Sequence, residues 1–356
     1  MIQIREFTSA DAFETLKSSW DELLEHSPTA TPFQTWEWQS TWWSFFGGNK
    51  QLRIVTLTDG DLLIGIYPLM ASAGPWRSLR PAGLGGSDYL GPLAREGYEL
   101  QVAVSLADYV RNCSGIDLVD LHQLRETLPL AIELGGVPHA RCLVLELPDD
   151  FETYLKRLGS SLRYDVRKSQ KRLAAGELTL SAASEFGIEK GLDALFELHK
   201  RRWRERRLPG AFLGRIPQFH RAWAPLAEAR GWLRLSVLTH DSVPIGALYA
   251  MSLHRRAYYY QAGFDPAHRS LSPGTLLVAQ AIRRHVEEGG FEFDFMRGDE
   301  PYKRRWKPQR EHANLRLILP RDGLRGATGA GWNRALSRVE SRIRAKLEGS
   351  SAIAPE

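Results

Sequence analysis

Alternating hydrophobic and polar positions recur in two stretches of the chain that lie 181 residues apart. Residues 52–70 (LRIVTLTDGDLLIGIYPLM) match residues 233–251 (LRLSVLTHDSVPIGALYAM). Each stretch predicts a strand, a turn and a second strand that is entered through Ile-Gly. Such self-similarity at a fixed distance is the signature of a repeated structural unit.

The segments after the two stretches also match. In the first copy, an amphipathic helix over residues 98–110 is followed by a strand over 115–121 that contains Asp120. In the second copy, a helix over 275–288 is followed by a strand over 291–295 that contains Asp294. The order of elements is the same in both, so we expect two α/β domains of one topology in tandem, each a mixed central sheet flanked by helices.

The second copy predicts more elements than the first. We expect strands over 142–147, 178–181, 232–239, 245–253, 257–264 and 313–319, and helices over 150–158, 160–174 and 300–306, from Ile188, and from Pro273. The Gly-rich segment 321–330 predicts a linker. A last amphipathic helix, 331–347, has an apolar stripe made of Trp332, Leu336, Val339, Ile343 and Leu347. The expected domains are therefore 1–140 and 141–320, followed by the linker and helix of 321–356.

Length and charge sharpen this division. The chain has 356 residues, 43% hydrophobic and 25% charged, which is the balance of a globular protein with two cores. Its net charge of +5 is unevenly spread. Residues 1–150 hold 10 basic and 20 acidic side chains, whereas residues 151–356 hold 37 and 22. The basic second half is expected to meet an anion.

Several function classes are excluded by what the sequence lacks. Cys113 and Cys142 make no disulfide framework or zinc motif, and the histidines show no paired spacing, so we expect no metal. No phosphate-loop or serine-hydrolase motif is present. The N-terminus is charged, and the longest uncharged run, 62–76, is broken by Gly and Pro. We expect a cytoplasmic protein, or one peripheral to the inner face of the membrane.

Five segments together resemble the GNAT acyltransferase superfamily. They are TPFQTWEWQSTWWSFFG (31–47), SLRYDVRKSQKRL (161–173), FELHKRRWRERR (196–207), YYYQAGFDPAHRSLSPGTLL (258–277) and FDFMRGDEPYKRRW (293–306). The tandem arrangement is similar to the double-domain branch that includes CelD/BcsL-type acetyltransferases and Fem-type aminoacyltransferases. This resemblance implies transfer of an acyl group from a thioester, usually acyl-CoA or acetyl-CoA, to an amine or hydroxyl acceptor.

The resemblance places the donor at the strand and helix around residues 258–277. In such folds the splayed strand end bonds pantetheine, and Gly263 is a candidate for the bulge that re-aims the backbone. Ser272, Gly274 and Thr275 open a helix whose N-terminus suits a pyrophosphate, with Arg269 just before it. A strand-ending glycine and an ordinary helix start explain the same residues.

The densest polar cluster lies in residues 293–306. Asp294 lies between two phenylalanines of the strand, so its side chain points into a sheet face, where a carboxylate needs a partner. It is a candidate general base, or it forms a structural ion pair with Arg297. Asp299 is a candidate cap for the next helix, with Glu300 after it, and these residues with Arg297 are candidates for substrate binding.

The remaining catalytic candidates lie close by in the sequence or on the preceding long helix. The resemblance implies that Tyr302 protonates the leaving thiolate, and Lys303 is a candidate for binding phosphate or the acceptor. His199 is a candidate base because of its near-neutral pKa, but its place on an apolar stripe favours a core histidine.

The acceptor is expected on the acidic first domain. The Gly-rich loop 83–92 carries Asp88 and Tyr89, and a carboxylate there would favour an ammonium group at a cleft between the domains. A structural turn is an equally good interpretation. The acceptor class is a small-molecule, glycan or lipid amine.

The basic segments leave two alternative functions open. Residues 163–172 and 200–207 suit CoA phosphates, anionic lipids or, in a Fem-type transferase, aminoacyl-tRNA. The last helix carries five basic residues beside its apolar stripe, so it suits an anionic membrane surface or docking on the first domain. The second alternative is a non-catalytic module that binds lipid or polymer.

Overall fold

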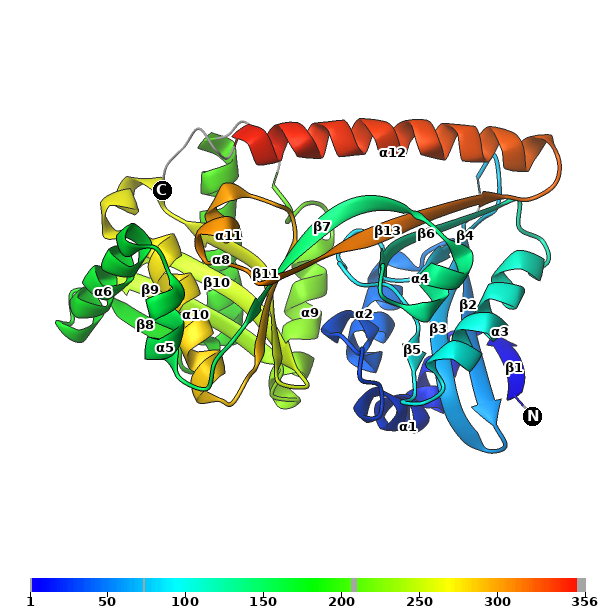
Figure 1. Ribbon diagram of the computed structural model, residues 1–356, viewed down its shortest axis with the longest axis horizontal. Coiled ribbons are helices and arrows are strands. Elements are labelled where there is room, and N and C mark those ends of the chain that lie inside the picture. Colours follow the sequence, from blue (N-terminus) through cyan, green and yellow to red (C-terminus); the bar gives the residue numbers. More distant parts are fainter. Residues whose placement is uncertain (1, 73, 206–209, 351–356) are drawn as a thin grey trace. The chain divides into compact units, whose positions relative to one another are not determined.

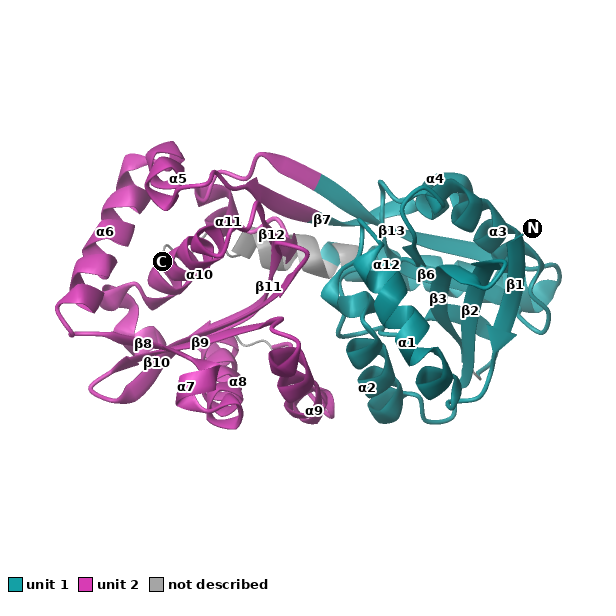
Figure 2. Ribbon diagram, turned by 90° about the horizontal axis from the view of Figure 1, so that it is seen from below, with its two compact units in different colours: residues 1–141, 312–347 teal, residues 142–311, 348–356 magenta. Residues whose placement is uncertain are grey.

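The computed structural model describes residues 2–72, 74–205 and 210–350, without the side chains of residues 341 and 343–350. It divides into two compact units, coloured separately in Figure 2. Unit 1 comprises residues 1–141 and 312–347, and unit 2 is built on residues 142–311. The strand expected to close the second domain therefore joins unit 1 from residue 312 onward.

Unit 1 is a sheet with helices on both faces. Its elements are β1 (Ile2–Phe7), α1 (Ala12–Glu25), η1 (Pro32–Gln34), α2 (Trp36–Phe46), β2 (Gln51–Asp59), β3 (Leu62–Ser72), β4 (Ser78–Pro81), β5 (Leu93–Ala94), α3 (Glu99–Asn112), β6 (Leu118–Arg125), α4 (Pro129–Leu134), most of β13 (Arg310–Pro320) and α12 (Leu324–Ser350). The first half of β7 (Val137–Glu146) also belongs to it.

Unit 2 repeats this plan. Its elements are the rest of β7, α5 (Phe151–Arg157), α6 (Ser160–Ala174), β8 (Thr179–Ala182), α7 (Ala183–Phe186), α8 (Ile188–Glu205), α9 (Ile216–Ala229), β9 (Leu233–His240), β10 (Val243–Leu253), β11 (Arg256–Phe264), η2 (Pro266–Leu271), α10 (Pro273–Glu287), β12 (Glu292–Arg297) and α11 (Pro301–Arg305). The mixed α/β fold class expected from the sequence is confirmed.

The two units have the same sheet topology. In unit 1 the strand order is β1-β2-β3-β4-β6-β13, and in unit 2 it is β8-β9-β10-β11-β12-β7. One neighbouring pair in each sheet is parallel, namely β4 with β6 and β11 with β12, and the other neighbours are antiparallel. A helix connects the parallel strands in both cases, as such crossovers require.

The register of the parallel pairs confirms that Asp120 and Asp294 occupy equivalent positions. Val119 pairs with Leu79, and Phe293 pairs with Ala257. Each aspartate is the next residue of its strand.

The glycine of the repeated Ile-Gly pair is required for the same reason in both units. A Cβ on Gly65 would stand 2.8 Å from Val102 of α3, and one on Gly246 would stand 2.8 Å from Leu277 of α10. The glycines let the crossover helix approach its sheet.

The sixth strand of each sheet comes from the other sequence copy. By the order of elements, β7 follows β6 and α4 as β13 follows β12 and α11, so β7 closes the first copy, although its residues from 142 onward were expected to open the second. Yet β7 pairs with β12 from Cys142 onward, and β13 pairs with β6 from Asn314 onward. The two copies thus exchange their last strands.

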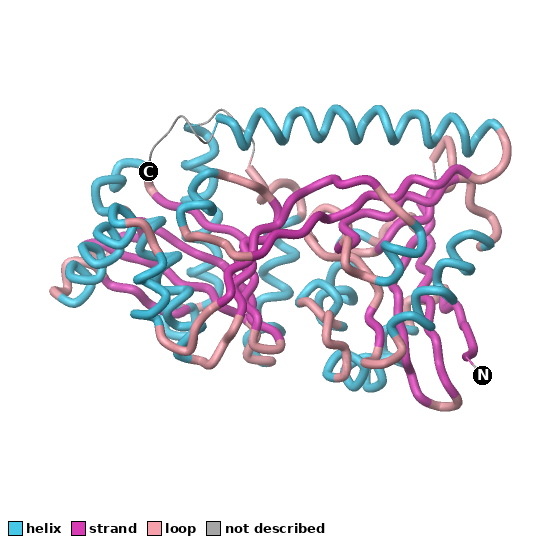
Figure 3. The backbone as a smooth tube through the Cα atoms, viewed as in Figure 1, coloured by secondary structure: helices cyan, strands magenta, loops and turns pink. Residues whose placement is uncertain are grey.

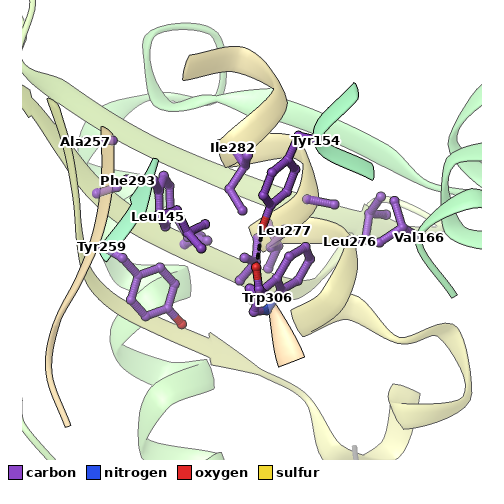
Figure 4. Close-up of a cluster of buried hydrophobic side chains, with 14 of the residues drawn as sticks. Leu145, Tyr154, Val166, Ala257, Tyr259, Leu276, Leu277, Ile282, Phe293 and Trp306 are labelled. Atoms are coloured by element: carbon purple, nitrogen blue, oxygen red, sulfur yellow. Dashed lines mark hydrogen bonds between the residues drawn. The ribbon is translucent and has the colours of Figure 1, made fainter. Parts of the chain in front are cut away.

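Helices cover both faces of the unit 2 sheet, as Figures 1 and 2 show. One face carries α5, α6 and α10, and the other carries α7, α8 and α9. The core beneath α10 includes Leu145, Tyr154, Val166, Phe293 and Trp306, drawn in Figure 4. There the Tyr154 hydroxyl donates to the Trp306 carbonyl oxygen at 2.9 Å, which fixes the end of α11 to the core.

Two sequence expectations fail in the helices. The Gly-rich segment 321–330 is not a linker, because α12 begins at Leu324 and runs unbroken in Figure 3. Two of its glycines are packing positions, since a Cβ on Gly326 would stand 2.7 Å from the Asp117 carbonyl oxygen and one on Gly329 would stand 2.9 Å from the Trp76 ring. The second failure concerns α9, because the sequence predicted no helix over these residues. Pro225 lies inside this helix. Because proline usually ends a helix, the helical spacing of the apolar residues Phe219 and Trp223 did not indicate one.

Candidate active site

Strands β11 and β12 run side by side for only three residues. Arg256, Ala257 and Tyr258 pair with Glu292, Phe293 and Asp294, and beyond this point no pairing continues although both strands do. The pairing of β10 with β11 shifts between Tyr249 and Ala250, which leaves Tyr260 as the extra residue. The bulge is therefore at Tyr260, and Gly263, for which the sequence suggested this role, pairs regularly with Ala247. The bulge thus lies two residues after Tyr258, where the pairing of β11 with β12 ends.

Gly263 has a different structural reason. Helix α8 crosses β11 here, and a Cβ on Gly263 would stand 2.8 Å from the Leu198 carbonyl carbon and 2.9 Å from the His199 Cα. Backbone atoms cannot move aside as a flexible side chain can. Glycine is needed for this close approach, and the approach brings the C-terminal turns of α8 to the separated end of β11.

A pocket lies at this end of β11. Its lining comes from α8, β11, α10, α11 and the residue after α11, and comprises Arg202, Tyr259, Ala262, Gly263, Phe264, Gly274, Thr275, Leu277, Val278, Tyr302 and Trp306. Four of the residues expected from sequence, Gly263, Gly274, Thr275 and Tyr302, are thus brought together. Ser272 and Arg269 do not line it.

Two tyrosines and an arginine give the pocket its polar chemistry. Tyr302 is half-buried and shares a side-chain hydrogen bond with Tyr259, which is 7% exposed. Burial, together with the negative charge that Tyr302 would carry if ionised, raises the pKa of Tyr259 well above its usual value. Arg202, whose guanidinium lies 4.8 Å from the Phe264 ring centre, favours the opposite shift. The hydroxyl of Tyr259 is therefore protonated near neutral pH.

The first turn of α10 supplies backbone donors to the same pocket. Pro273 has no N–H and the Leu276 N–H donates to the Ser272 carbonyl oxygen, so Gly274 and Thr275 have the first-turn N–H groups without an acceptor inside the helix. Ser272 adopts a left-handed conformation with φ of 52° and turns the chain into the helix. Arg269 forms an ion pair with Glu205 at 3.3 Å. A positive helix end at this position suits an anionic group.

Asp294 is fully buried and does not line the pocket. Its carboxylate accepts a 2.7 Å hydrogen bond from the backbone N–H of Met296, a residue with φ of 57°. The carboxylate thus holds the left-handed turn at the end of β12. This geometry favours the structural interpretation over that of a general base, and the ion pair with Arg297 stays a prediction.

Lys303 is buried rather than available to a phosphate. Its ammonium lies 2.6 and 3.3 Å from the carbonyl oxygens of Arg297 and Gly298 and 2.9 Å from Glu300 Oε2. These three acceptors surround the cation, and it ties the β12–α11 loop together. The role in phosphate or acceptor binding is therefore not supported.

Asp299 does not cap α11, as the sequence suggested. The N-cap residue is Glu300, without a side-chain cap bond, and the carboxylate of Asp299 accepts two hydrogen bonds from Arg304 at 2.5 and 2.7 Å. Asp299 and Glu300 thus stabilise the loop and helix that carry Tyr302. Their predicted contact with substrate remains untested.

His199 is a core histidine. Its Nε2 accepts from the Ala211 N–H at 3.0 Å, so Nδ1 carries the proton and faces the Ala262 carbonyl oxygen at 3.4 Å. Burial lowers its pKa to about 4. Both ring nitrogens have partners, which favours the structural interpretation that the sequence had preferred.

The Gly-rich loop of unit 1 is held by the Trp-rich segment. The indole N–H of Trp38 donates to Ser87 at 2.8 Å, and that of Trp42 donates to the Leu84 carbonyl oxygen at 3.2 Å. Within the loop Asp88 is 7% exposed, and Tyr89 is packed against Arg125, whose guanidinium lies 4.5 Å from the ring centre. The two candidate side chains of the loop are thus mostly buried.

In unit 1 the position equivalent to Asp294 holds an ion cluster. Asp120 accepts from Arg316 at 2.9 and 3.1 Å, lies 3.2 Å from Arg80 and 3.0 Å from His122, and accepts from Asn333 at 3.1 Å. Burial alone would raise the pKa of Asp120, but the hydrogen bonds from His122 and Arg316 outweigh it and hold the pKa well below its usual value.

The helix start of unit 1 also differs. Helix α3, the equivalent of α10, begins at Glu99, whose negative charge opposes an anion at that end. The features that suit an anionic donor therefore occur in unit 2.

Sequence reasoning missed Arg202, Tyr259 and Trp306 as pocket residues. Strand alternation could have found Tyr259, because it shares the face of Ala257 and lies before the bulge. Arg202 was hidden within a basic run, where single residues carry no distinguishing signal.

Among the residues that the structure describes, no group of three or more His, Cys, Asp or Glu side chains could hold a metal ion. Within the same part of the chain, every helix is too short or too polar to cross a bilayer.

Comparison with protein families identifies the domain in unit 2. Residues 160–304 match the model described as an acetyltransferase (GNAT) domain. This range runs from α6 to α11 and contains every residue of the pocket except Trp306. The residues that match a GNAT acetyltransferase domain thus lie within unit 2. A search of curated proteins gave no match.

Solved structures show a similar fold over nearly the whole chain. The structure of FemX is similar with a TM-score of 0.66 at 12% identity, covering 89% of this chain and 97% of FemX. The C-terminal domain of a proposed lysylphosphatidylglycerol synthetase from Agrobacterium fabrum has a TM-score of 0.55 at 13% identity, covering 90% and 95%. L-PGS from Bacillus licheniformis has a TM-score of 0.51 at 13% identity, covering 92% and 96%. At these identities the likeness concerns the fold.

Proposed function

We propose that unit 2 transfers an acyl group from an acyl-CoA thioester to an amine, or to a hydroxyl, of an acceptor. The observation that carries this proposal is the convergence of three features on one pocket. They are the separated end of β11, the first turn of α10 and the Tyr259–Tyr302 pair. The matched GNAT domain coincides with this pocket.

Each feature fits one part of such a donor. Beyond Tyr258 the pairing of β11 with β12 stops, so the backbone groups on that side of β11 can offer hydrogen bonds to the amides of the pantetheine arm. The N–H groups of Gly274 and Thr275 favour the pyrophosphate, and Arg202 adds positive charge nearby. The thioester would then lie toward Tyr302.

The chemical step is direct transfer. The acceptor nitrogen forms a bond to the carbonyl carbon, the carbon–sulfur bond breaks, and the thiolate takes a proton from the Tyr302 hydroxyl. The proton lost by the nitrogen restores the tyrosine. Tyr259 acts as a positioning residue, because its hydrogen bond orients the Tyr302 hydroxyl.

The acceptor side of the proposal rests on unit 1. We propose that Asp88 and Tyr89 on the Gly-rich loop recognise the amine, as the acidic composition of residues 1–150 suggests. The segments 31–47 and 293–306 support a place in the CelD/BcsL-type branch, with an acceptor from envelope polysaccharide or lipid synthesis.

The experiment is calorimetric titration of the full chain with acetyl-CoA, a long-chain acyl-CoA and free CoA. One donor per chain should bind, and Asp88→Asn, in the other unit, should bind it equally well. Transfer is then measured by the CoA thiol released with a panel of amines and alcohols. Both free cysteines are buried, so the thiol background is low.

The absence of heat and of thiol release with every acyl-CoA would overturn the CoA donor. Steeply salt-dependent binding of aminoacyl-tRNA in its place would support the Fem-type alternative, which the likeness to FemX makes worth including. Mass spectrometry of any ligand that co-purifies would identify the donor directly.

A further inference from the structure

Helix α12 docks on unit 1 through small and polar residues rather than through its apolar ones. Asn333 is 3% exposed and donates to Asp120, and Glu340 pairs with Arg316 at 3.2 Å. Nearer the start of the helix, a Cβ on Gly326 would stand 2.7 Å from the Asp117 carbonyl oxygen. The docking face is therefore already occupied and needs no apolar side chain.

The apolar residues of α12 form a separate, exposed surface, which we call the outer stripe. It consists of Trp332, Leu336 and Val339, which are 59%, 42% and 51% exposed. Their spacing of four and three residues places them on one side of the helix. Trp332 and Val339 each lie one residue before a docking position, Asn333 and Glu340, so the stripe is adjacent to the docked face. The sequence stripe continues to Ile343 and Leu347, whose side chains lie outside the described residues.

Basic residues flank the outer stripe on one side. Arg338 and Arg342 are exposed on the same stretch of helix, whereas Arg334 donates to the Ile318 carbonyl oxygen of β13 at 3.3 Å. The only acidic residue between 324 and 342 is Glu340, and its carboxylate is paired with Arg316. The outward side of α12 is thus both apolar and positively charged.

We propose that the outer stripe docks on an anionic membrane surface. Leu336 and Val339 would enter the boundary of the acyl chains, and the indole of Trp332 would lie at the level of the headgroups, where tryptophan is enriched. The arginines would contact the anionic headgroups. This inference does not depend on the proposed transfer reaction.

Charge favours a membrane over a second copy of the chain. Two outer stripes facing one another would bring their arginines together, and within residues 324–342 the only carboxylate is Glu340, which is already paired with Arg316. An anionic surface supplies the missing charge. The surface also explains why a helix that is already docked keeps a tryptophan exposed.

The test is sedimentation of the full chain with vesicles of phosphatidylcholine, alone or with about 30% phosphatidylglycerol. The bound fraction should rise with phosphatidylglycerol and fall as salt is added. The variant Trp332→Ser, Leu336→Ser, Val339→Ser should lower the partition coefficient roughly tenfold or more, because the apolar contact is lost. The variant Arg338→Gln, Arg342→Gln should lose the preference for anionic vesicles.

The matched control is Leu100→Ser, Val104→Ser on α3, where the two side chains are 70% and 52% exposed. It removes exposed apolar surface from another helix of unit 1 and should leave vesicle binding unchanged. Circular dichroism and thermal unfolding check that each variant is folded. Equal binding of the Trp332 variant and the parent chain would overturn the proposal. The proposal would also be overturned if the parent chain did not bind vesicles but formed a dimer in sedimentation velocity, and if the same three serine substitutions made it monomeric.

Discussion

Gly263 lies against the backbone of His199, so that a Cβ on the glycine would stand 2.9 Å from the His199 Cα. This contact fixes the distance between α8 and the separated end of β11. It connects two parts of the candidate site, because Arg202 is one turn further along α8 and Gly263 itself lines the pocket.

Gly263→Ala should therefore destabilise the chain and weaken donor binding together. Overpacking against backbone costs about 1–3 kcal/mol, and relief requires α8 to move away from β11. Urea unfolding and calorimetric titration with acyl-CoA measure the two effects. The control is Gly159→Ala, where a Cβ meets nothing within 4 Å. If Gly263→Ala unfolds like the parent chain, the close approach does not constrain the site.

Tyr302→Phe should slow transfer and leave the donor affinity unchanged. The substitution removes the hydroxyl while it keeps the ring in the pocket, and loss of a general acid lowers the rate by about 10²–10⁴-fold. Rapid-quench measurement of thioester cleavage gives the rate, and titration gives the affinity. Tyr164→Phe, on the exposed side of α6, is the matched control. An unchanged rate would remove Tyr302 from the mechanism.

Asp120→Asn should destabilise unit 1 strongly. The change leaves Arg316 and Arg80 near a neutral group in a buried site, and breaking a buried ion pair costs about 3–5 kcal/mol. The comparison is Asp108→Asn, an exposed residue 3.9 Å from Arg111, where about 1 kcal/mol or less is expected. Chemical unfolding monitors both. Donor binding by the folded fraction should persist, because Asp120 belongs to the other unit.

Mild acid should destabilise unit 2 through its buried histidines. Burial lowers the pKa of His199 to about 4 and that of His220 to about 3, whereas the unfolded value is about 6.5. The unfolded chain binds more protons as pH falls below about 6.5, so stability decreases from there toward pH 4. His199→Gln should flatten this dependence in urea unfolding near pH 7.5 and pH 5, and His26→Gln, at an exposed helix end, should not. Parallel pH profiles for parent and His199→Gln would contradict it.

The sequence predicted the repeated elements well because local pattern determines them. Helix α6 has the bounds that were expected, and the strands of both copies lie within a few residues of their predicted places. Residues that depend on distant partners were harder. Lys303 looked like an exposed cation in a basic run, but the carbonyl groups of its own loop enclose it. The bulge was placed at a glycine, whereas the register of β10 and β11 puts it at Tyr260.

Site residues that belong to a local sequence motif could be predicted, whereas residues that depend on contacts between distant segments could not. Gly274, Thr275 and Tyr302 were found because a helix start and a family motif mark them. The packing of Gly326 and Gly329 could not be seen, because Asp117 and Trp76 are more than 200 residues away. Glycine content alone therefore predicted a linker where tertiary contacts form a helix.

The exchange of last strands has a consequence for biosynthesis. Unit 2 is built on one continuous stretch, 142–311, and has all its strands once that stretch has left the ribosome. Unit 1 is synthesised first but finishes second, because Arg316 and Asn333 arrive after the whole of unit 2. Until then Asp120 has Arg80 and His122 beside it but lacks Arg316 and Asn333, and β6 has a free edge, a state prone to mispairing with other chains. During synthesis the N-terminal half of the chain is therefore the part most prone to mispairing.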